Sequence, residues 1–234
     1  MPQTHQDAAH VLPRSLRRAV ETVSTLGLHI TCYASALLAI PYVIGRYRKN
    51  IAKLIGEISF GSASLLAGGG TIGVVFAMSF VASTQAGREG YRGLHLLGLS
   101  PMTGLLGALV NTRELAPIVA SIALAAKVGT GFTAQLGAMR IGEEIDALET
   151  MGVRSMPYLV STRMVAALIA VVPLYLVGLF ASYIATQVAI VTINGDSQGT
   201  YSYYFQLLLT PQDVFYSLLK ATVFAVLVTL VHCA

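Results

Sequence analysis

Two long stretches of the chain, residues 58–87 and 164–195, contain no charged side chain. Each is longer than the roughly 20 apolar residues that an α-helix needs to cross the hydrocarbon core of a bilayer. The pattern therefore predicts membrane-spanning helices over residues 58–85 and 165–193. Three glycines at residues 68–70 lie near the middle of the first predicted span, where missing side chains would let another helix approach closely.

Two further regions are hydrophobic but contain charged or polar residues. Residues 94–138 form one of them, and polar residues interrupt it around Asn111. Asn111 and Glu114 have the spacing of a helix N-cap and its third residue, which favours a break there followed by a full helix. The other region begins at Val214, contains Lys220, and is still hydrophobic at the last residue of the sequence.

The amino-terminal part of the chain has a different pattern. Residues 1–13 are polar and are predicted to be a disordered tail, whereas 14–53 suit an interfacial or re-entrant helical segment. Within that segment, residues 28–45 are uncharged and just long enough to span, but Pro41 interrupts them. An interfacial or re-entrant arrangement is favoured here, and a true span stays open as the alternative.

A short acidic segment, MRIGEEIDALETMG, connects two of the hydrophobic regions. Apolar residues recur in it with the spacing of one helix face, and acids occupy the other faces, so it predicts an amphipathic helix of about three turns that Gly152 ends. Arg140 and Glu144 have a spacing that allows a weak local ion pair. Such a helix could recruit a partner or could simply be a solvated connector. The apolar residues are Ile141, Ile145 and Leu148, and the acids are Glu143, Glu144, Asp146 and Glu149.

The hydrophobic helix before this segment carries small residues at every fourth position. In lipid, this spacing lets two helix backbones pack closely, so it predicts a helix or subunit interface, although a glycine-rich helix without a specific partner would look the same. Lys127 lies on the same helix, roughly 20 Å from the charged residues at either end. Such a lysine is costly in a membrane and usually faces a cavity or a partner, but it could also bind neighbouring backbone carbonyls. The small residues are Ser121, Ala125, Gly129, Thr133 and Gly137.

Composition supports an integral membrane protein, since only 11% of the residues are charged against roughly 25% in soluble domains. The net charge of +4 does not indicate nucleic-acid binding, because the basic residues are not interleaved with aromatic ones. Basic residues cluster before the first span and around the acidic segment, so the N-terminus and that segment are predicted to be cytoplasmic and residues 194–213 external. Arg88 and Arg92 fit this scheme less well.

The remaining chemistry in the sequence is sparse. Cys32 and Cys233 lie in apolar runs without metal-site spacing, so free thiols are expected and no metal site is predicted. The N-terminus lacks the pattern of a cleaved signal peptide. No Gly-Lys dipeptide occurs, which excludes a Walker A site in this chain. No catalytic residue is predicted, and the chain is not expected to be an enzyme.

The run RELAPIVASIALAAKVGTGFTAQLGAMRIGEEIDALETMGV, residues 113–153, resembles the signature region of the MlaE/YrbE family of permeases. Members of this family are the membrane subunits of ATP-binding-cassette lipid transporters that work with MCE proteins. The later PYLVSTRMVA and the run around Lys220 are also similar, so the resemblance covers about residues 50–234. The YRKN and NGDSQGTYSYYF segments look more like actinobacterial YrbE proteins from mce operons.

The resemblance implies an all-α integral membrane fold with an N-terminal interfacial helix and five spans, the fifth being absent from this sequence. It implies a permease domain over residues 54–234 with a cytoplasmic coupling helix, at about 139–151, between the second and third spans. The four spans present would lie near residues 57–86, 103–138, 160–193 and 212–234.

The family relation also implies partners and site residues. The expected partners are an ABC ATPase that binds ATP and Mg²⁺, a second YrbE-type permease in a heterodimer, MCE-domain proteins, and a lipid (fatty acid, sterol or phospholipid) in the bacterial inner membrane. The residues expected to couple to the ATPase are Arg140, Ile141, Glu143, Glu144, Ile145, Asp146, Leu148 and Glu149. The residues expected at the lipid cavity or a helix interface are Arg113, Glu114, Ser121, Ala125, Lys127, Gly129, Thr133, Gln135 and Gly137.

The chain departs from the family at two positions. Members such as MlaE have arginine in place of Lys127 and glutamate in place of Gln135, so this chain has lost the acid of a charge pair, which suits a heterodimer of unequal permeases. Two other classes of function stay open at this stage. One is an ion-coupled secondary transporter with Lys127 and Glu114 as relay residues, although no internal repeat is found. The other is a membrane scaffold that recruits a cytoplasmic partner.

Overall fold

The computed structural model describes residues 27, 31, 34–60, 70–152, 155 and 157–233, which form helices and turns and no strand. The predicted tail over 1–13, the basic residues at 14–18, Cys32, Gly68, Gly69 and Arg154 lie outside the described residues. The helical elements are α2 (Ile40–Arg46), α3 (Arg48–Phe60), α4 (Gly70–Leu96), η2 (Ser100–Met102), α5 (Thr103–Val110), η3 (Asn111–Leu115), α6 (Ala116–Ile141), α7 (Glu144–Thr150), η4 (Pro157–Ser161), α8 (Thr162–Val188), η5 (Ala189–Ile193), α9 (Gln198–Leu208) and α10 (Pro211–Cys233).

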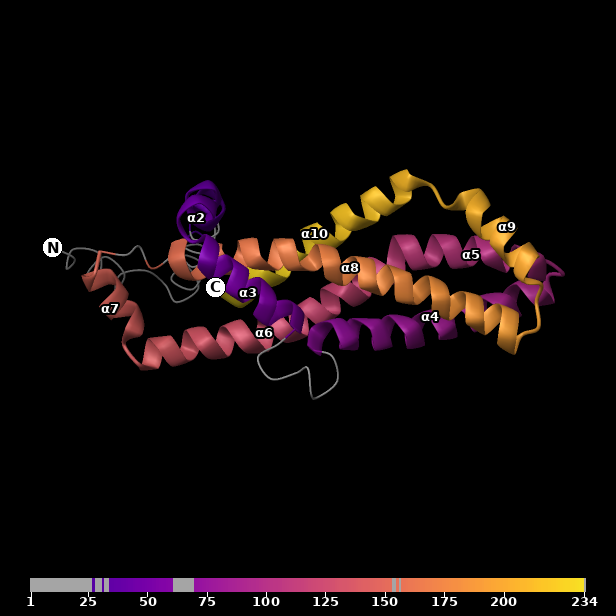
Figure 1. Ribbon diagram of the computed structural model, residues 1–234, viewed down its shortest axis with the longest axis horizontal. Helices are drawn as coiled ribbons and strands as arrows, with labels where there is room; N and C mark the ends of the chain where they lie inside the picture. The colour runs from indigo at the N-terminus through magenta and orange to yellow at the C-terminus, as the bar shows by residue number, and fades with distance from the viewer. Residues whose placement is uncertain are drawn as a thin grey trace, which may run out of the picture.

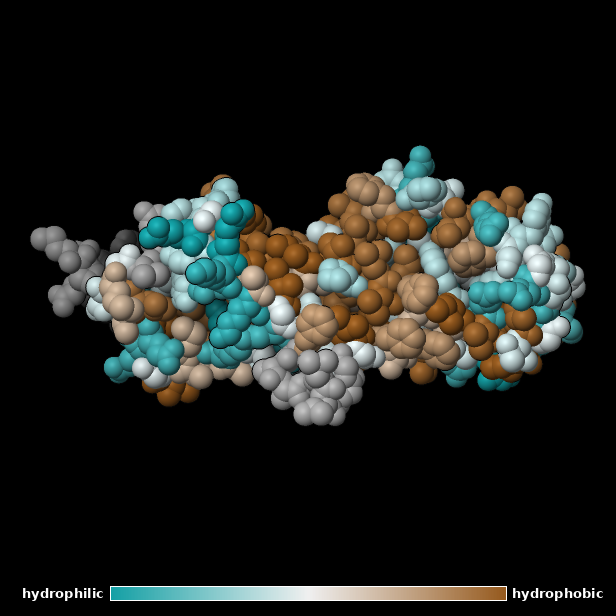
Figure 2. Space-filling model, viewed as in Figure 1, coloured by the Kyte–Doolittle hydropathy of each residue, from teal (hydrophilic) through white to brown (hydrophobic). Residues whose placement is uncertain are grey.

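Within the described residues, four helical stretches are long and apolar enough to cross a membrane, by length and composition. They confirm the predicted all-α polytopic fold. An apolar band covers the middle of the molecule, and hydrophilic surface lies toward both ends (Figure 2). The four stretches are Gly70–Leu96, Ser100–Ile141, Tyr158–Ile193 and Pro211–His232.

The helices form an elongated bundle in which α8 packs against α3, α4, α6 and α10 (Figure 1). Of the four candidate spans, the one containing α8 is the most buried, because α8 packs against four other helices, although its Leu176 and Phe180 stay exposed. The acidic helix α7 lies at the same end as α2 and α3, and α9 lies at the opposite end (Figure 1). The acidic segment, the basic residues of α2 and α3, and the tyrosine-rich segment therefore have the relative placement that the charge pattern predicts.

Residues 34–60 lie in none of the candidate spans. Pro41 stands in the first turn of α2, where its missing N–H would be unpaired in any helix, and Arg46 ends that helix. Helix α3 follows and packs along α8. The interfacial or re-entrant character of residues 14–53, and the alternative of a span over residues 28–45, stay predictions.

The first span differs from its prediction over 58–85. Ile58 is buried on α3, which ends at Phe60, and α4 begins at Gly70 and continues to Leu96. Gly70 has a φ of 62°, which glycine adopts at little cost, so this glycine begins a helix instead of lying in the middle of one. A charge-free stretch shows where lipid can be crossed, but it does not show where the helix begins.

The predicted break at Asn111 is wrong. Helix α5 continues through a single π-helical turn, η3, into α6, and the backbone of Asn111 is helical. Asn111 is buried, and its side-chain amide donates hydrogen bonds to the carbonyl oxygen of Ser182 and to Oγ1 of Thr186 at 2.7 Å. The asparagine therefore joins two helices, an interaction that local cap spacing cannot distinguish from a helix start.

Helices α5 and α9 approach closely at the end of the bundle opposite α7. A Cβ atom at Gly104 would collide with the backbone carbonyl oxygen of Tyr201, and one at Gly107 would lie 3.0 Å from the Tyr201 hydroxyl. Tyr201 is buried in this contact. The two glycines allow α9 to pack on α5 and so to cover this end of the second span.

Replacing Gly104 by alanine is expected to lower the stability of the protein by about 1–3 kcal/mol, because the added methyl group forces α9 away from α5. Unfolding of the purified protein in mixed micelles measures the effect. Gly93→Ala is the matched control, since a Cβ atom there meets nothing within 4 Å and alanine favours a helix. Equal stability of the two variants would show that α9 is not held by this contact.

Candidate functional site

The acidic segment is divided between two helices. Helix α6 continues to Ile141, Gly142 caps it, and Glu143 has a left-handed backbone with a φ of 55° before α7 begins. The predicted three-turn helix over 139–151 is therefore wrong: Arg140 and Ile141 belong to α6, and α7 has only 7 residues. Side-chain spacing gave no sign of the turn, because the residues on both sides of it are good helix formers. Gly152, with a φ of 75°, stands just past the end of α7, as predicted.

The turn divides the predicted apolar stripe. Ile141 is 86% exposed on α6, whereas Ile145 and Leu148 are half-buried on α7. Glu143, Glu144, Asp146 and Glu149 are exposed, and Glu149 accepts a hydrogen bond from the Ser155 hydroxyl. The ion pair that spacing allowed between Arg140 and Glu144 is not among those of the described residues. This end of the bundle thus presents the four acids together with Ile141 and Met151 to its surroundings.

The small-residue stripe on α6 faces α10 over part of its length. A Cβ atom at Gly129 would lie 2.5 Å from Nε2 of His232, and Oγ1 of Thr133 donates to the His232 carbonyl oxygen at 3.4 Å. Ser121 is buried, Ala125 is half-buried, and Gly137 is exposed and has open space beside it. Part of the predicted interface is therefore formed within this chain, and the end nearest α7 stays open.

Lys127 and Gln135 lie on the same helix but in different surroundings. Lys127 is exposed, has no hydrogen bond or ion pair within the described chain, and lines a cavity of about 220 Å³ between α3 and α6 that Glu57 and Gln135 also line. Gln135 accepts a hydrogen bond at 3.4 Å from Nη2 of Arg163, a buried arginine of α8. The role of Lys127 stays a prediction, while Arg163 is a buried cation that the charge pattern of the sequence does not distinguish from other basic residues.

The π-turn η3 leaves two backbone carbonyl groups without their usual helical partners. The N–H of Ala116 donates to the carbonyl oxygen of Asn111, so the carbonyl oxygen of Thr112 loses the donor it would have in an α-helix. The carbonyl oxygen of Arg113 also lacks its donor, because Pro117 has no N–H. Helix α10 supplies both replacements. The Ser217 hydroxyl donates to the Thr112 carbonyl oxygen, and Nζ of Lys220 donates to that of Arg113 at 3.2 Å.

Two ion pairs lie beside these hydrogen bonds, and they also join η3 to α10. Arg113 donates through Nη2 to Oδ1 of Asp213 at 2.7 Å, and Nζ of Lys220 lies 2.6 Å from Oε2 of Glu114. Together these four residues line an open cavity of about 540 Å³. We call Arg113, Glu114, Asp213 and Lys220 the charged cluster. Glu114 therefore pairs with Lys220 and not with Lys127.

The resemblance indicated Arg113 and Glu114 as site residues, but nothing in the sequence identified their partners. Asp213 and Lys220 lie about a hundred residues further along the chain, and no spacing rule connects them. One signal was available in the sequence. Arg113 and Glu114 stand in one apolar region, Asp213 and Lys220 stand in or beside another, and charges of opposite sign in a membrane tend to pair. Among the described residues, no group of His, Cys, Asp and Glu could hold a metal ion.

Known proteins resemble this chain over most of its length. The sequence profile of a family described as Permease MlaE matches residues 61–234. A probable ABC transporter permease protein of Rickettsia prowazekii is 27% identical over 220 residues, covering 84% of this chain and 83% of the relative. One of Rickettsia typhi is 30% identical over 164 residues, covering 68% and 62%. The chloroplast protein trigalactosyldiacylglycerol 1 of Arabidopsis thaliana is 28% identical over 163 residues, covering 70% of this chain and 44% of that protein.

Replacing Ser217 by alanine is expected to destabilise the protein by about 0.5–2 kcal/mol, because the Thr112 carbonyl oxygen is left buried without a donor. Unfolding in mixed micelles measures this loss. Ser83→Ala makes the same chemical change at a buried hydroxyl that has no hydrogen-bond partner, so it is expected to be nearly neutral. The capping role of Ser217 is excluded if both variants lose the same stability.

Proposed function

The chain belongs to the MlaE permease family, and on that basis we propose that it is the membrane-spanning subunit of an ATP-driven lipid transporter that works with MCE-domain proteins. Its relatives named as probable ABC transporter permeases support the ATP-driven part of the proposal. The bacterial inner membrane, with the N-terminus in the cytoplasm, is the proposed location.

One structural observation carries the proposal: α6 connects an exposed acidic end to the charged cluster without a break. The α7 end presents Glu144, Asp146 and Glu149 to the surroundings, beside the half-buried pair Ile145 and Leu148. Exposed acids around a small apolar surface suit a basic groove on another protein, since charge steers the approach and apolar burial holds it. We assign this end to the contact with an ATPase subunit, which binds ATP and Mg²⁺.

The lipid assignment rests on two further points. One relative carries a galactolipid in its name, trigalactosyldiacylglycerol 1. In addition, α6 exposes Lys127 and Gly137, which form no hydrogen bond or ion pair with α10 among the described residues. We propose that this surface lines a lipid cavity shared with a second permease. The two replacements at 127 and 135 suit a heterodimer, because the acid missing from this chain would then come from its partner.

A secondary transporter with a relay between Lys127 and Glu114 is less well supported. Glu114 forms its ion pair with Lys220 on α10, and Lys127 lies on the side of α6 that faces α3. The two proposed relay residues are thus not brought together in this structure.

The double variant Asp146→Lys, Glu149→Lys tests the proposal. Reversing both charges is expected to abolish most copurification of the ATPase with this chain and to uncouple ATP hydrolysis from lipid transfer in proteoliposomes. Subunits are identified by mass spectrometry after purification from membranes, where an MCE-domain protein should also be recovered with the unaltered chain.

Two controls separate the alternatives. Glu89→Lys reverses an exposed acid on α4 and should retain the ATPase, whereas Ser155→Ala removes the hydrogen bond to Glu149 without changing charge. Full coupling in the double variant would refute the role of α7. An unaltered chain that moves lipid without any ATPase would instead support a secondary transporter.

A further inference from the structure

Lys127 is an exposed lysine in the middle of α6 that has no ion pair or hydrogen bond within the described chain. The two ends of this helix are each roughly 20 Å away along its axis, too far for the side chain to reach. A lysine so placed in a membrane is costly unless it finds an acceptor. Its partner is therefore expected among the groups that line the same cavity.

That cavity has a volume of about 220 Å³ and lies between α3 and α6. We call it the α3–α6 cavity. Its lining contains one carboxylate, that of Glu57 on α3, and one ammonium group, that of Lys127 on α6. Two opposite charges across an otherwise uncharged cavity attract each other more strongly than they would in water, because the surroundings are less polarisable. The uncharged lining residues are Ile58, Gly131, Phe132 and Gln135.

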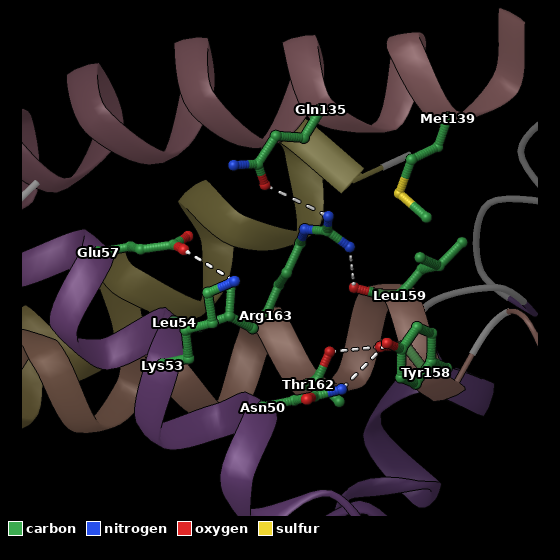
Figure 3. A pocket seen from close by; sticks show the side chains of 10 residues that line it. All are labelled: Asn50, Lys53, Leu54, Glu57, Gln135, Met139, Tyr158, Leu159, Thr162 and Arg163. Carbon is green, nitrogen blue, oxygen red and sulfur yellow. Dashed lines mark hydrogen bonds and ion pairs between the residues drawn. The ribbon is translucent and has the colours of Figure 1, made fainter. Parts of the chain in front are cut away.

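The present partner of Glu57 holds it only weakly. Its Oε1 lies 3.9 Å from Nζ of Lys53, one turn earlier on α3, and the Lys53 side chain is 79% exposed (Figure 3). This separation is at the long end for an ion pair, and exposed pairs add little to stability. The order of lysine before glutamate is also the less favourable one on a helix. The Glu57 carboxylate can therefore change its partner at little cost.

Arg163 is the other cation near Glu57, since both line the neighbouring cavity between α3, α6 and α8. Its guanidinium points toward α6, where Nη2 donates to Gln135, and its Nη1 donates to the carbonyl oxygen of Leu159 (Figure 3). Within the described chain it forms no ion pair with Glu57. Lys53 is thus the cation that Lys127 has to displace.

The cavity leaves room for the lysine side chain to turn toward α3. Gly131 lies one turn after Lys127 and lines the same cavity, and a Cβ atom there would meet nothing within 4 Å. The four-carbon stem of lysine is flexible, and its ammonium group can donate in three directions. On the other side, Ile58 is buried in the core and holds the backbone of α3 beside Glu57. The approach of the two charges therefore depends on side-chain rotation.

We propose that Glu57 exchanges Lys53 for Lys127 and that the new ion pair closes the α3–α6 cavity. Helix α3, which lies in none of the candidate spans, is thereby attached to the middle of a spanning helix. The exchange does not depend on the transport function proposed above. It takes the acid for Lys127 from this chain, whereas the heterodimer would take it from a second permease.

A crosslinker without a spacer tests the exchange in the full-length chain, kept in its membranes with its associated subunits. A membrane-permeant carbodiimide activates a carboxylate, which then forms an amide bond with a lysine only where the two groups are in contact. After digestion, mass spectrometry distinguishes the product that joins Glu57 to Lys127 from the one that joins Glu57 to Lys53. Both are expected in the unaltered chain, because the two lysines share one carboxylate.

Removal of the competing lysine should shift the ratio of the two products. Lys53→Gln is expected to raise the yield of the product with Lys127 about two- to fivefold, which is the range that a weak exposed ion pair can hold back. Lys49→Gln is the matched control, since it makes the same change one turn earlier on α3 at an exposed residue that lines neither cavity. It should leave both yields unchanged.

Unfolding in mixed micelles provides a second measurement that does not depend on crosslinking. The effect of Glu57→Gln on the free energy of unfolding is expected to disappear largely in a chain that already carries Lys127→Gln, because both substitutions remove the same ion pair.

Three outcomes would overturn the proposal. Absence of the product with Lys127 in Lys53→Gln would show that the two charges do not meet. A crosslink from Lys127 to an acid of another subunit, in place of Glu57, would show that a partner supplies the acid. Additive effects of Glu57→Gln and Lys127→Gln on unfolding would show that the two side chains act independently.

Discussion

A backbone carbonyl group within the hydrocarbon of a membrane must find its hydrogen-bond donor inside the protein, because no water is available there. The second span of this chain meets that constraint in an unusual place. A π-helical turn and Pro117 leave the carbonyl groups of Thr112 and Arg113 without helical donors, and Ser217 and Lys220 of α10 supply them. The position of α10 is thus tied to the backbone of η3 as well as to the side chains of Arg113 and Glu114. The charged cluster forms around this contact, since the lysine that caps Arg113 also pairs with Glu114.

Close packing of small residues complements these polar contacts at the other levels of the bundle. Gly87 and Gly107 both leave room for the methyl group of Thr186, and Gly178 leaves room for Ser79, so α4, α5 and α8 approach one another closely. In lipid such contacts, together with interhelical hydrogen bonds, take the place of hydrophobic burial. Helix α8 is therefore the most buried, although α4, α8 and α10 each keep an apolar face exposed. On α10 that face is a regular series of residues, Phe215, Leu219, Val223, Leu227 and Val231.

Whether a prediction was right depended on how far apart in the sequence the interacting residues lie. Spans were predictable from long apolar stretches, because crossing lipid depends on composition over about 20 residues. The failures occur where a residue has a partner far away in the chain. Asn111 looked like a local cap but bonds to α8, and the pairs of Arg113 with Asp213 and of Glu114 with Lys220 join segments about a hundred residues apart. Arg163 stands just before the predicted span over 165–193 and is buried against Gln135, and one left-handed residue at Glu143 was enough to divide the acidic helix.

The unbroken course of α6 has a mechanical consequence. From Ala116 to Ile141 it contains 26 residues and is about 39 Å long, so it behaves as one rigid helix. The end next to η3 is held by the hydrogen bonds from α10. If the helix tilted by about 5° around the π-turn, its far end would move by about 3 Å, while the charged cluster beside the pivot would hardly shift. Any displacement of the acidic end would therefore change the angle between α6 and the helices it packs against, α4, α8 and α10.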